Sequence, residues 1–120
     1  MRNFALRHFG RYIILSELGF VFQNLVYHLL SEKKQYDGSK IHFWRTKDKA
    51  EVDFVINEGD EIMPIEVKCK ELKDKEIGRS LRGFINRYNP AEAWVVNINF
   101  NDEEKIGETM VRFIPFSELL

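Results

Sequence analysis

The chain has 120 residues, of which 44% are hydrophobic and 13% aromatic, and its formal net charge is −1. These values exclude an intrinsically disordered chain, which needs low hydrophobicity and high net charge, and a protein that binds nucleic acid through its overall charge. The length predicts one domain with a single modest core. Cys69 is the only cysteine, which excludes an internal disulfide, and no apolar run reaches the roughly 20 residues of a membrane span, so we expect a cytoplasmic protein.

The first clear element is an amphipathic helix that begins near Ser16, a candidate N-cap. Its apolar residues recur at steps of three and four, which predicts one wide stripe facing the core. The stripe consists of Leu18, Val21, Phe22, Leu25, Val26 and Leu29. Residues 1–15 lack a clean period and are expected to form an arm or a short helix, and residues 37–39 carry a turn signal.

Three strand-like segments follow at residues 40–46, 50–57 and 61–69, each with alternating apolar positions. Short polar turns at 47–49 and 58–60 join them, so we expect an antiparallel meander. Pro64 weakens the third strand unless its missing N–H falls at a bulge or at an unpaired position.

A second helix is expected after a charged segment, with Leu81, Phe84, Ile85 and Tyr88 on its buried face and a stop at Asn89-Pro90. Residues 93–98 are nearly all apolar and predict a strand buried on both faces. An acidic loop at 101–107, a last strand at 109–114 and a terminal helical turn at 116–120 complete a single α/β domain.

Charge is unevenly distributed along the chain. The segment from Lys68 to Arg87 holds seven Lys and Arg residues against three Asp and Glu residues. Such a patch either faces phosphates or is an ordinary solvated surface.

Two acids and one lysine stand out in the second and third predicted strands. Asp53 lies in Glu51-Val52-Asp53-Phe54, and Glu66 and Lys68 lie in Ile65-Glu66-Val67-Lys68. Side chains at i and i+2 of a strand project from one face, so Glu66 and Lys68 are expected to project together. An antiparallel pairing of the two strands would bring Asp53 close to Glu66.

Two neighbouring carboxylates repel each other unless a cation lies between them. Mg²⁺, with Mn²⁺ as a substitute, suits such a site because it takes oxygen ligands and keeps several waters. It would polarise a phosphoryl oxygen while Lys68 offsets developing negative charge. The alternative is an ordinary cross-strand ion pair on an exposed face.

The order of these motifs resembles the PD-(D/E)XK nuclease superfamily, with its restriction-endonuclease-like fold. The resemblance assigns Asp53, Glu66 and Lys68 to a catalytic metal site.

A closer resemblance is to the C-terminal domain of unknown function that follows the AAA-type ATPase module of many prokaryotic proteins. The matching stretches are Arg2-Asn3-Phe4-Ala5-Leu6, Gly19-Phe20-Val21-Phe22-Gln23-Asn24-Leu25-Val26, Phe43-Trp44-Arg45, Glu51-Val52-Asp53-Phe54-Val55 and Ile65-Glu66-Val67-Lys68. It implies a single domain over residues 1–120, with a mixed β-sheet, an antiparallel three-strand meander and flanking helices.

Two departures from the related sequences bear on function. Gln23 stands where the related helix usually has a glutamate, on the rim of the apolar stripe and within reach of the sheet. Its amide oxygen joins Asp53 and Glu66 in the implied metal site, but one negative charge is lost and metal affinity should fall. The chain also has no Gly-x-x-x-x-Gly-Lys-Ser/Thr loop, so the ATPase module is absent.

Three functions remain open from the sequence. The first is a metal-dependent endonuclease, weakened or vestigial because of Gln23, that acts on DNA. The second is a nuclease-like domain without chemistry that binds DNA or a partner. The third is a packing module of an AAA-type ATPase in which the acids form internal ion pairs.

Overall fold

The computed structural model describes residues 11–33, 40–45 and 51–120. Its elements in chain order are the helix α2 (Arg11–Lys33), the strands β1 (Ile41–Arg45), β2 (Glu51–Glu58) and β3 (Glu61–Val67), the helix α3 (Arg79–Tyr88), the strands β4 (Glu92–Asn97), β5 (Asp102–Ile106) and β6 (Thr109–Pro115), and the 3₁₀ helix η1 (Phe116–Leu119). The predicted turns at 37–39 and 47–49 and the matching stretch at 2–6 lie outside the described residues.

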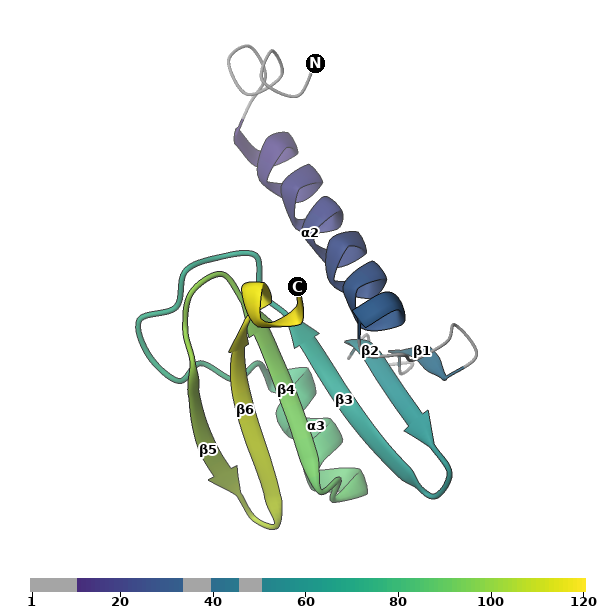
Figure 1. The fold of residues 1–120 in the computed structure, drawn as a ribbon. Helices are drawn as coiled ribbons and strands as arrows, with labels where there is room; N and C mark the ends of the chain where they lie inside the picture. Colours follow the sequence, from purple (N-terminus) through teal and green to yellow (C-terminus); the bar gives the residue numbers. More distant parts are fainter. Residues whose placement is uncertain (1–10, 34–39, 46–50) are drawn as a thin grey trace.

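The six strands form one mixed sheet in the order β1-β2-β3-β4-β6-β5. The pairs β1–β2, β2–β3 and β5–β6 are antiparallel, which confirms the predicted meander, whereas β3–β4 and β4–β6 are parallel. The helix α2 and the short η1 lie over one face of the sheet, and α3 lies over the other (Figure 1). The predicted α/β architecture with flanking helices is therefore confirmed.

The β2–β3 hairpin explains how an inner strand accommodates Pro64. Gly59 has φ +62° and begins a two-residue turn between the paired residues Glu58 and Glu61. Hydrogen-bonded and non-hydrogen-bonded pairs alternate from this turn, so Val55 and Pro64 form a non-hydrogen-bonded pair. The missing N–H of Pro64 therefore faces β4, whose pairing with β3 begins only at the next residue.

The helix α2 differs from its prediction in two ways. It begins at Arg11, so the expected start at Ser16 is wrong, because no residue between them interrupts a helix and serine is tolerated in a helix interior. Only part of the predicted stripe packs on the sheet: Phe22, Val26 and Leu29 are buried, together with Leu30. The other part is exposed, with Leu18 at 39%, Val21 at 45% and Leu25 at 39%.

The core has two layers, one on each face of the sheet. The layer beneath α2 is built from Val26, Leu30, Phe54, Ile65 and Val96, together with η1 residues. The layer beneath α3 consists of two clusters. The larger contains Leu72, Leu81, Ile85, Ala93, Val95, Val111 and Phe113, and the smaller contains Val52, Val55 and Phe84. All of β4 from Ala93 to Asn97 is buried, as its apolar run predicts.

The second half of the chain agrees with its prediction except at one strand. Leu81, Phe84 and Ile85 are buried on α3, and Asn89 adopts the left-handed conformation that ends the helix, whereas Tyr88 is 41% exposed. The segment expected to be an acidic loop contains β5, an edge strand that pairs with β6. No helix in the described part of the chain has the length and apolarity needed to cross a membrane.

Candidate functional site

Asp53 lies at an irregularity of the sheet. His42 pairs with Val55 and Trp44 pairs with Val52, so two β2 residues, Asp53 and Phe54, stand opposite one β1 residue. This arrangement is a β-bulge, which interrupts the usual alternation of side chains and often re-aims one of them. Phe54 enters the core layer beneath α2, and Asp53 is directed to the same side.

Both oxygens of the Asp53 carboxylate accept hydrogen bonds from the protein. The amide Nε2 of Gln23 donates to Oδ1 at 2.7 Å, and the backbone N–H of Val67 donates to Oδ2 at 2.7 Å. The first contact fixes α2 against the sheet, and the second joins β2 to the end of β3, beyond the last residue pair of their ladder. Asp53 therefore links three elements at one point.

Glu66 faces the other helix. Its strand partner is Val95, which belongs to the core layer beneath α3. Its Oε1 accepts a hydrogen bond of 3.2 Å from the backbone N–H of Gly78, the residue that caps α3. A carboxylate at this position stabilises the helix because the N-terminus of a helix carries a partial positive charge.

Gly78 leaves the space that the Glu66 carboxylate occupies. A Cβ atom at position 78 would overlap the Glu66 carboxylate, and glycine has no side chain with which to cap α3 itself. Glu66 thus binds the backbone N–H of the N-cap residue, as the glutamate of a capping box does, but it does so from a neighbouring strand.

Lys68 completes this side of the site. Its ammonium lies 3.4 Å from Oε2 of Glu66 and 3.5 Å from Oε1 of Glu76, and Lys70 lies 2.8 Å from the same oxygen of Glu76. The Lys70 hydrogen bond, aided by the charges of both lysines, lowers the pKa of the exposed Glu76 carboxyl from its usual value. The Lys68 side chain is only 17% exposed, so its contact with Glu66 is partly shielded from water.

The structure thus brings the predicted residues together as two pairs. Asp53 contacts Gln23 on the α2 side, and Glu66 contacts Lys68 on the α3 side. The backbone of Val67, which donates to Asp53, lies between them in the chain. Sequence reasoning expected Glu66 and Lys68 to project together and placed Gln23 within reach of the sheet, and both contacts are present. The expected approach of Asp53 to Glu66 is wrong, because the bulge directs Asp53 toward α2 while Glu66 faces α3.

The fit of a divalent metal to these residues is poor in this arrangement. The Asp53 and Glu66 oxygens already accept hydrogen bonds from the Gln23 amide and from two backbone N–H groups, and Glu66 is ion-paired with the Lys68 ammonium. The Gln23 group directed at Asp53 is the N–H donor, whereas a metal needs the amide oxygen. Across the described ranges, no three His, Cys, Asp or Glu side chains are grouped closely enough to hold a metal ion.

Sequence reasoning missed the roles of Gly78 and Glu76. A glycine directly before the predicted helix, in place of a capping side chain, was the available signal for Gly78. Glu76 gave no local signal, because its pairing with Lys68 and Lys70 depends on the path of the loop between β3 and α3.

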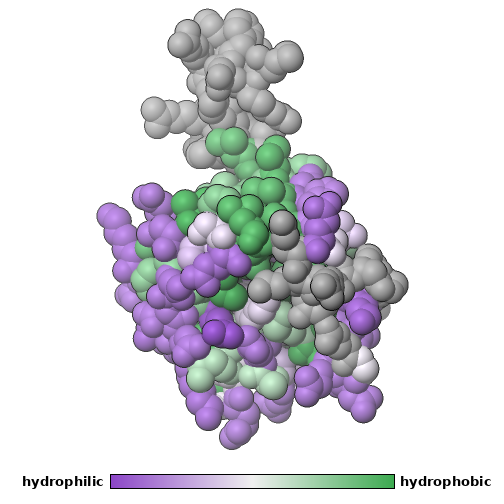
Figure 2. Space-filling view, in the orientation of Figure 1, coloured by the Kyte–Doolittle hydropathy of each residue, from purple (hydrophilic) through white to green (hydrophobic). Residues whose placement is uncertain are grey.

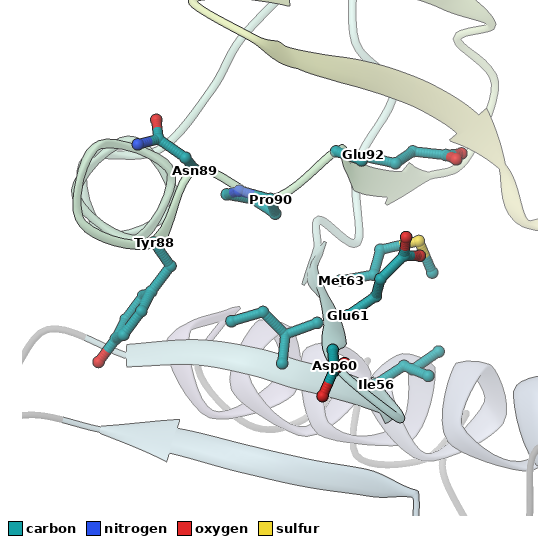
Figure 3. Close-up of a pocket in the computed structure, with 10 residues that line it drawn as sticks. Ile56, Asp60, Glu61, Met63, Tyr88, Asn89, Pro90 and Glu92 are labelled. Carbon is teal, nitrogen blue, oxygen red and sulfur yellow. The ribbon is translucent and has the colours of Figure 1, made fainter.

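A cavity of about 420 Å³ lies away from these residues, between the β2–β3 turn and the connection from α3 to β4. The residues that line it include Asp60, Glu61, Tyr88 and Glu92 (Figure 3). Glu92 is already bound to Trp94 and to Arg112. This cavity and the predicted site are therefore separate features.

Comparison with known proteins gives one family and one fold. The family described as "Domain of unknown function (DUF4143)" matches residues 18–119. No curated protein matches the chain. Among solved structures, a chain of the refined half-complex from a tetradecameric assembly of Thermococcus gammatolerans McrB AAA+ hexamers with bound McrC is similar, with a TM-score of 0.56 and 12% identity. The match covers 81% of this chain but only 27% of that one, and at this identity it shows a shared fold.

Proposed function

The chain belongs to the family described as a domain of unknown function, DUF4143, and we propose that it serves as a non-catalytic domain that docks on an AAA-type ATPase. In this proposal Asp53, Glu66 and Lys68 have a structural role. A weak or vestigial Mg²⁺-dependent nuclease that acts on DNA is the competing proposal, and it requires a divalent metal at Asp53 and Glu66.

The observation that carries the docking proposal is the exposed apolar face of α2. Leu18, Val21 and Leu25 are spaced at i, i+3 and i+7, the spacing of a helix that packs along a second helix. Phe20, on the same helix, is also apolar and is 66% exposed. Figure 2 shows this apolar surface as a continuous green area over α2. Contiguous apolar patches are uncommon on isolated proteins and mark surfaces that bind partners.

The structural comparison supports a protein partner of the AAA class. The similar fold comes from an assembly in which AAA+ hexamers hold a bound partner protein. The motif order of this chain also resembles the domain that follows an AAA-type ATPase module in other proteins. We infer that α2, whose sheet-facing side fixes its position, presents Leu18, Val21 and Leu25 to an ATPase module.

The internal contacts support the non-catalytic part of the proposal. A nuclease of this type needs carboxylates that are open to a metal, whereas Asp53 is held by Gln23 and Val67, and Glu66 by Gly78 and Lys68. These contacts tie α2, β2, β3 and α3 together. The two acids are thus better suited to fixing the helices on the sheet than to binding an ion.

The docking proposal is tested by placing a charge on the exposed face of α2. Val21→Glu is expected to weaken binding to a cognate AAA-type ATPase module at least tenfold, about 1.4 kcal/mol, because the carboxylate would be buried without a partner. The melting temperature should change little, since position 21 is 45% exposed. Analytical size-exclusion chromatography and calorimetric titration give the two readings.

Leu120→Glu is the matched control, because Leu120 is 67% exposed and lies at the end of η1 rather than on α2. It should bind the ATPase as the unaltered protein does. Equal binding by all three proteins would place the interface elsewhere, and the lack of any complex would refute the docking proposal.

A further inference from the structure

The outward face of α3 carries positive charge without compensating acids. The helix contains Arg79, Arg82 and Arg87 and no Asp or Glu. Arg79, Arg82, Gly83 and Asn86 follow the spacing i, i+3, i+4 and i+7, and all four are exposed, whereas Leu81 and Phe84 face the core. The helix therefore shows one continuous basic and polar face, called here the α3 face.

The guanidinium groups of the α3 face are available for a ligand. Among the described residues, Arg79 and Arg82 take part in no ion pair. The nearby acid Glu76 is already bound by Lys68 and Lys70. Arg87 lies 5.3 Å from the ring centroid of Tyr88, which holds its cation over an aromatic surface. The basic face is thus not neutralised by the chain itself.

Gly83 gives a second, independent indication. Glycine is less favourable than alanine inside a helix, and here a Cβ atom would meet nothing within 4 Å. Packing within this chain therefore does not require a glycine at position 83. A glycine between two exposed arginines lets an extended ligand approach the helix backbone closely.

We propose that the α3 face binds the phosphodiester backbone of a nucleic acid without reading its sequence. Arginine matches phosphate because its planar fork donates two hydrogen bonds at once. A helix of this length is about 15 Å long, which spans several phosphates of one strand. The chain as a whole has net charge −1, whereas the segment from Lys68 to Arg87 is basic, so a polyanion is attracted to this face rather than to the molecule as a whole.

This surface is distinct from the exposed face of α2, since the two helices cover opposite sides of the sheet (Figure 1). Binding of nucleic acid at α3 can therefore be tested independently of docking through α2. It also needs no metal at Asp53 or Glu66.

The test measures the affinity of the full chain for a labelled mixed-sequence DNA duplex by fluorescence anisotropy at several KCl concentrations. We expect a dissociation constant in the range of about 1–100 μM that rises steeply with salt. Arg79→Ala with Arg82→Ala should weaken binding about tenfold and reduce the slope of log K against log salt by about 2. Gly83→Leu should weaken binding about fivefold with no change in slope, since it alters no charge but fills the contact surface.

The double variant Lys105→Ala with Arg112→Ala is the matched control, because it removes the same charge from β5 and β6. It should retain most of the affinity, and thermal melting should show that every variant is folded. Equal losses in both double variants would reduce the effect to overall charge and overturn the proposal. Absence of binding to DNA would also overturn the proposal. Displacement of the DNA by polyglutamate at equal charge would overturn it as well, because that result would indicate an acidic protein as the partner.

Discussion

Replacement of Asp53 with alanine is expected to lower the free energy of unfolding by about 3 kcal/mol. The carboxylate accepts hydrogen bonds of 2.7 Å from Gln23 and from the backbone of Val67, so its removal leaves two donors without this partner. Half-buried donors that lose a charged acceptor are costly because water replaces it incompletely. For a domain of this size the loss corresponds to a fall of about 10 °C or more in melting temperature.

Asp53→Asn separates the loss of the hydrogen bonds from the loss of charge. The amide oxygen still accepts from Val67, so the destabilisation should be less than half that of Asp53→Ala. Chemical denaturation followed by circular dichroism gives both free energies. A change below about 0.5 kcal/mol for Asp53→Ala, the range of ordinary surface substitutions, would show that Asp53 does not hold these elements together.

Much of the fold follows from local patterns in the sequence. The meander was predictable because Gly59 and the polar residues around it permit a two-residue turn between alternating segments. The burial of β4 was predictable because its residues are almost all apolar. The strand β5 was not, because it lies at the sheet edge with Asp102, Glu103 and Lys105 exposed, and its pairing with β6 supplies the order that side-chain pattern does not.

The helix α2 shows why periodicity alone was insufficient. Leu18, Val21 and Leu25 share the apolar spacing of Phe22 and Val26, but the sheet contacts only one side of the helix. A sequence pattern reports that residues are apolar and does not report which partner covers them. In this case the uncovered part of the stripe is itself the feature that indicates an interaction surface.

The candidate site was predictable as a set of residues but not as an arrangement. The sequence placed Asp53, Glu66, Lys68 and Gln23 on neighbouring elements, and each of them makes contacts near the ends of β2 and β3. Simple alternation does not reveal the bulge at Asp53 and Phe54, because a bulge depends on pairing with β1. Nor does it reveal that Glu66 caps α3, because that contact depends on the path of the chain from β3 to Gly78.

Gln23→Glu tests directly why these residues do not form an open metal site. The substitution replaces an N–H donor with a carboxylate at a contact that is now 2.7 Å from Oδ1 of Asp53. Two carboxylates at this distance disfavour double ionisation, so one of them has its folded-state pKa raised above its unfolded value. The variant should be less stable than the unaltered protein by about 2 kcal/mol at pH 7.

The sign of the pH dependence follows from the raised pKa. The deficit should disappear below about pH 4, where the carboxyl is protonated in both states, and should grow as pH rises through the raised folded-state pKa. A divalent cation offers the alternative compensation, because it is attracted to the paired carboxylates. In 10 mM Mn²⁺ the variant should regain about 1–2 kcal/mol, whereas the melting temperature of the unaltered protein should rise by less than about 1 °C.

Gln23→Met is the matched control, since it removes the same hydrogen bond without adding charge. Its stability deficit should be independent of Mn²⁺ and should vary less with pH than that of Gln23→Glu, because it removes a hydrogen bond to the Asp53 carboxylate without adding a second negative charge. A rise of several degrees for the unaltered protein in Mn²⁺, abolished by Asp53→Ala, would instead establish a resident metal and revive the nuclease proposal. If Mn²⁺ stabilises only the glutamate variant, then the amide at position 23 is what closes this site to a cation, and the residues around it act by joining α2 and α3 to the sheet.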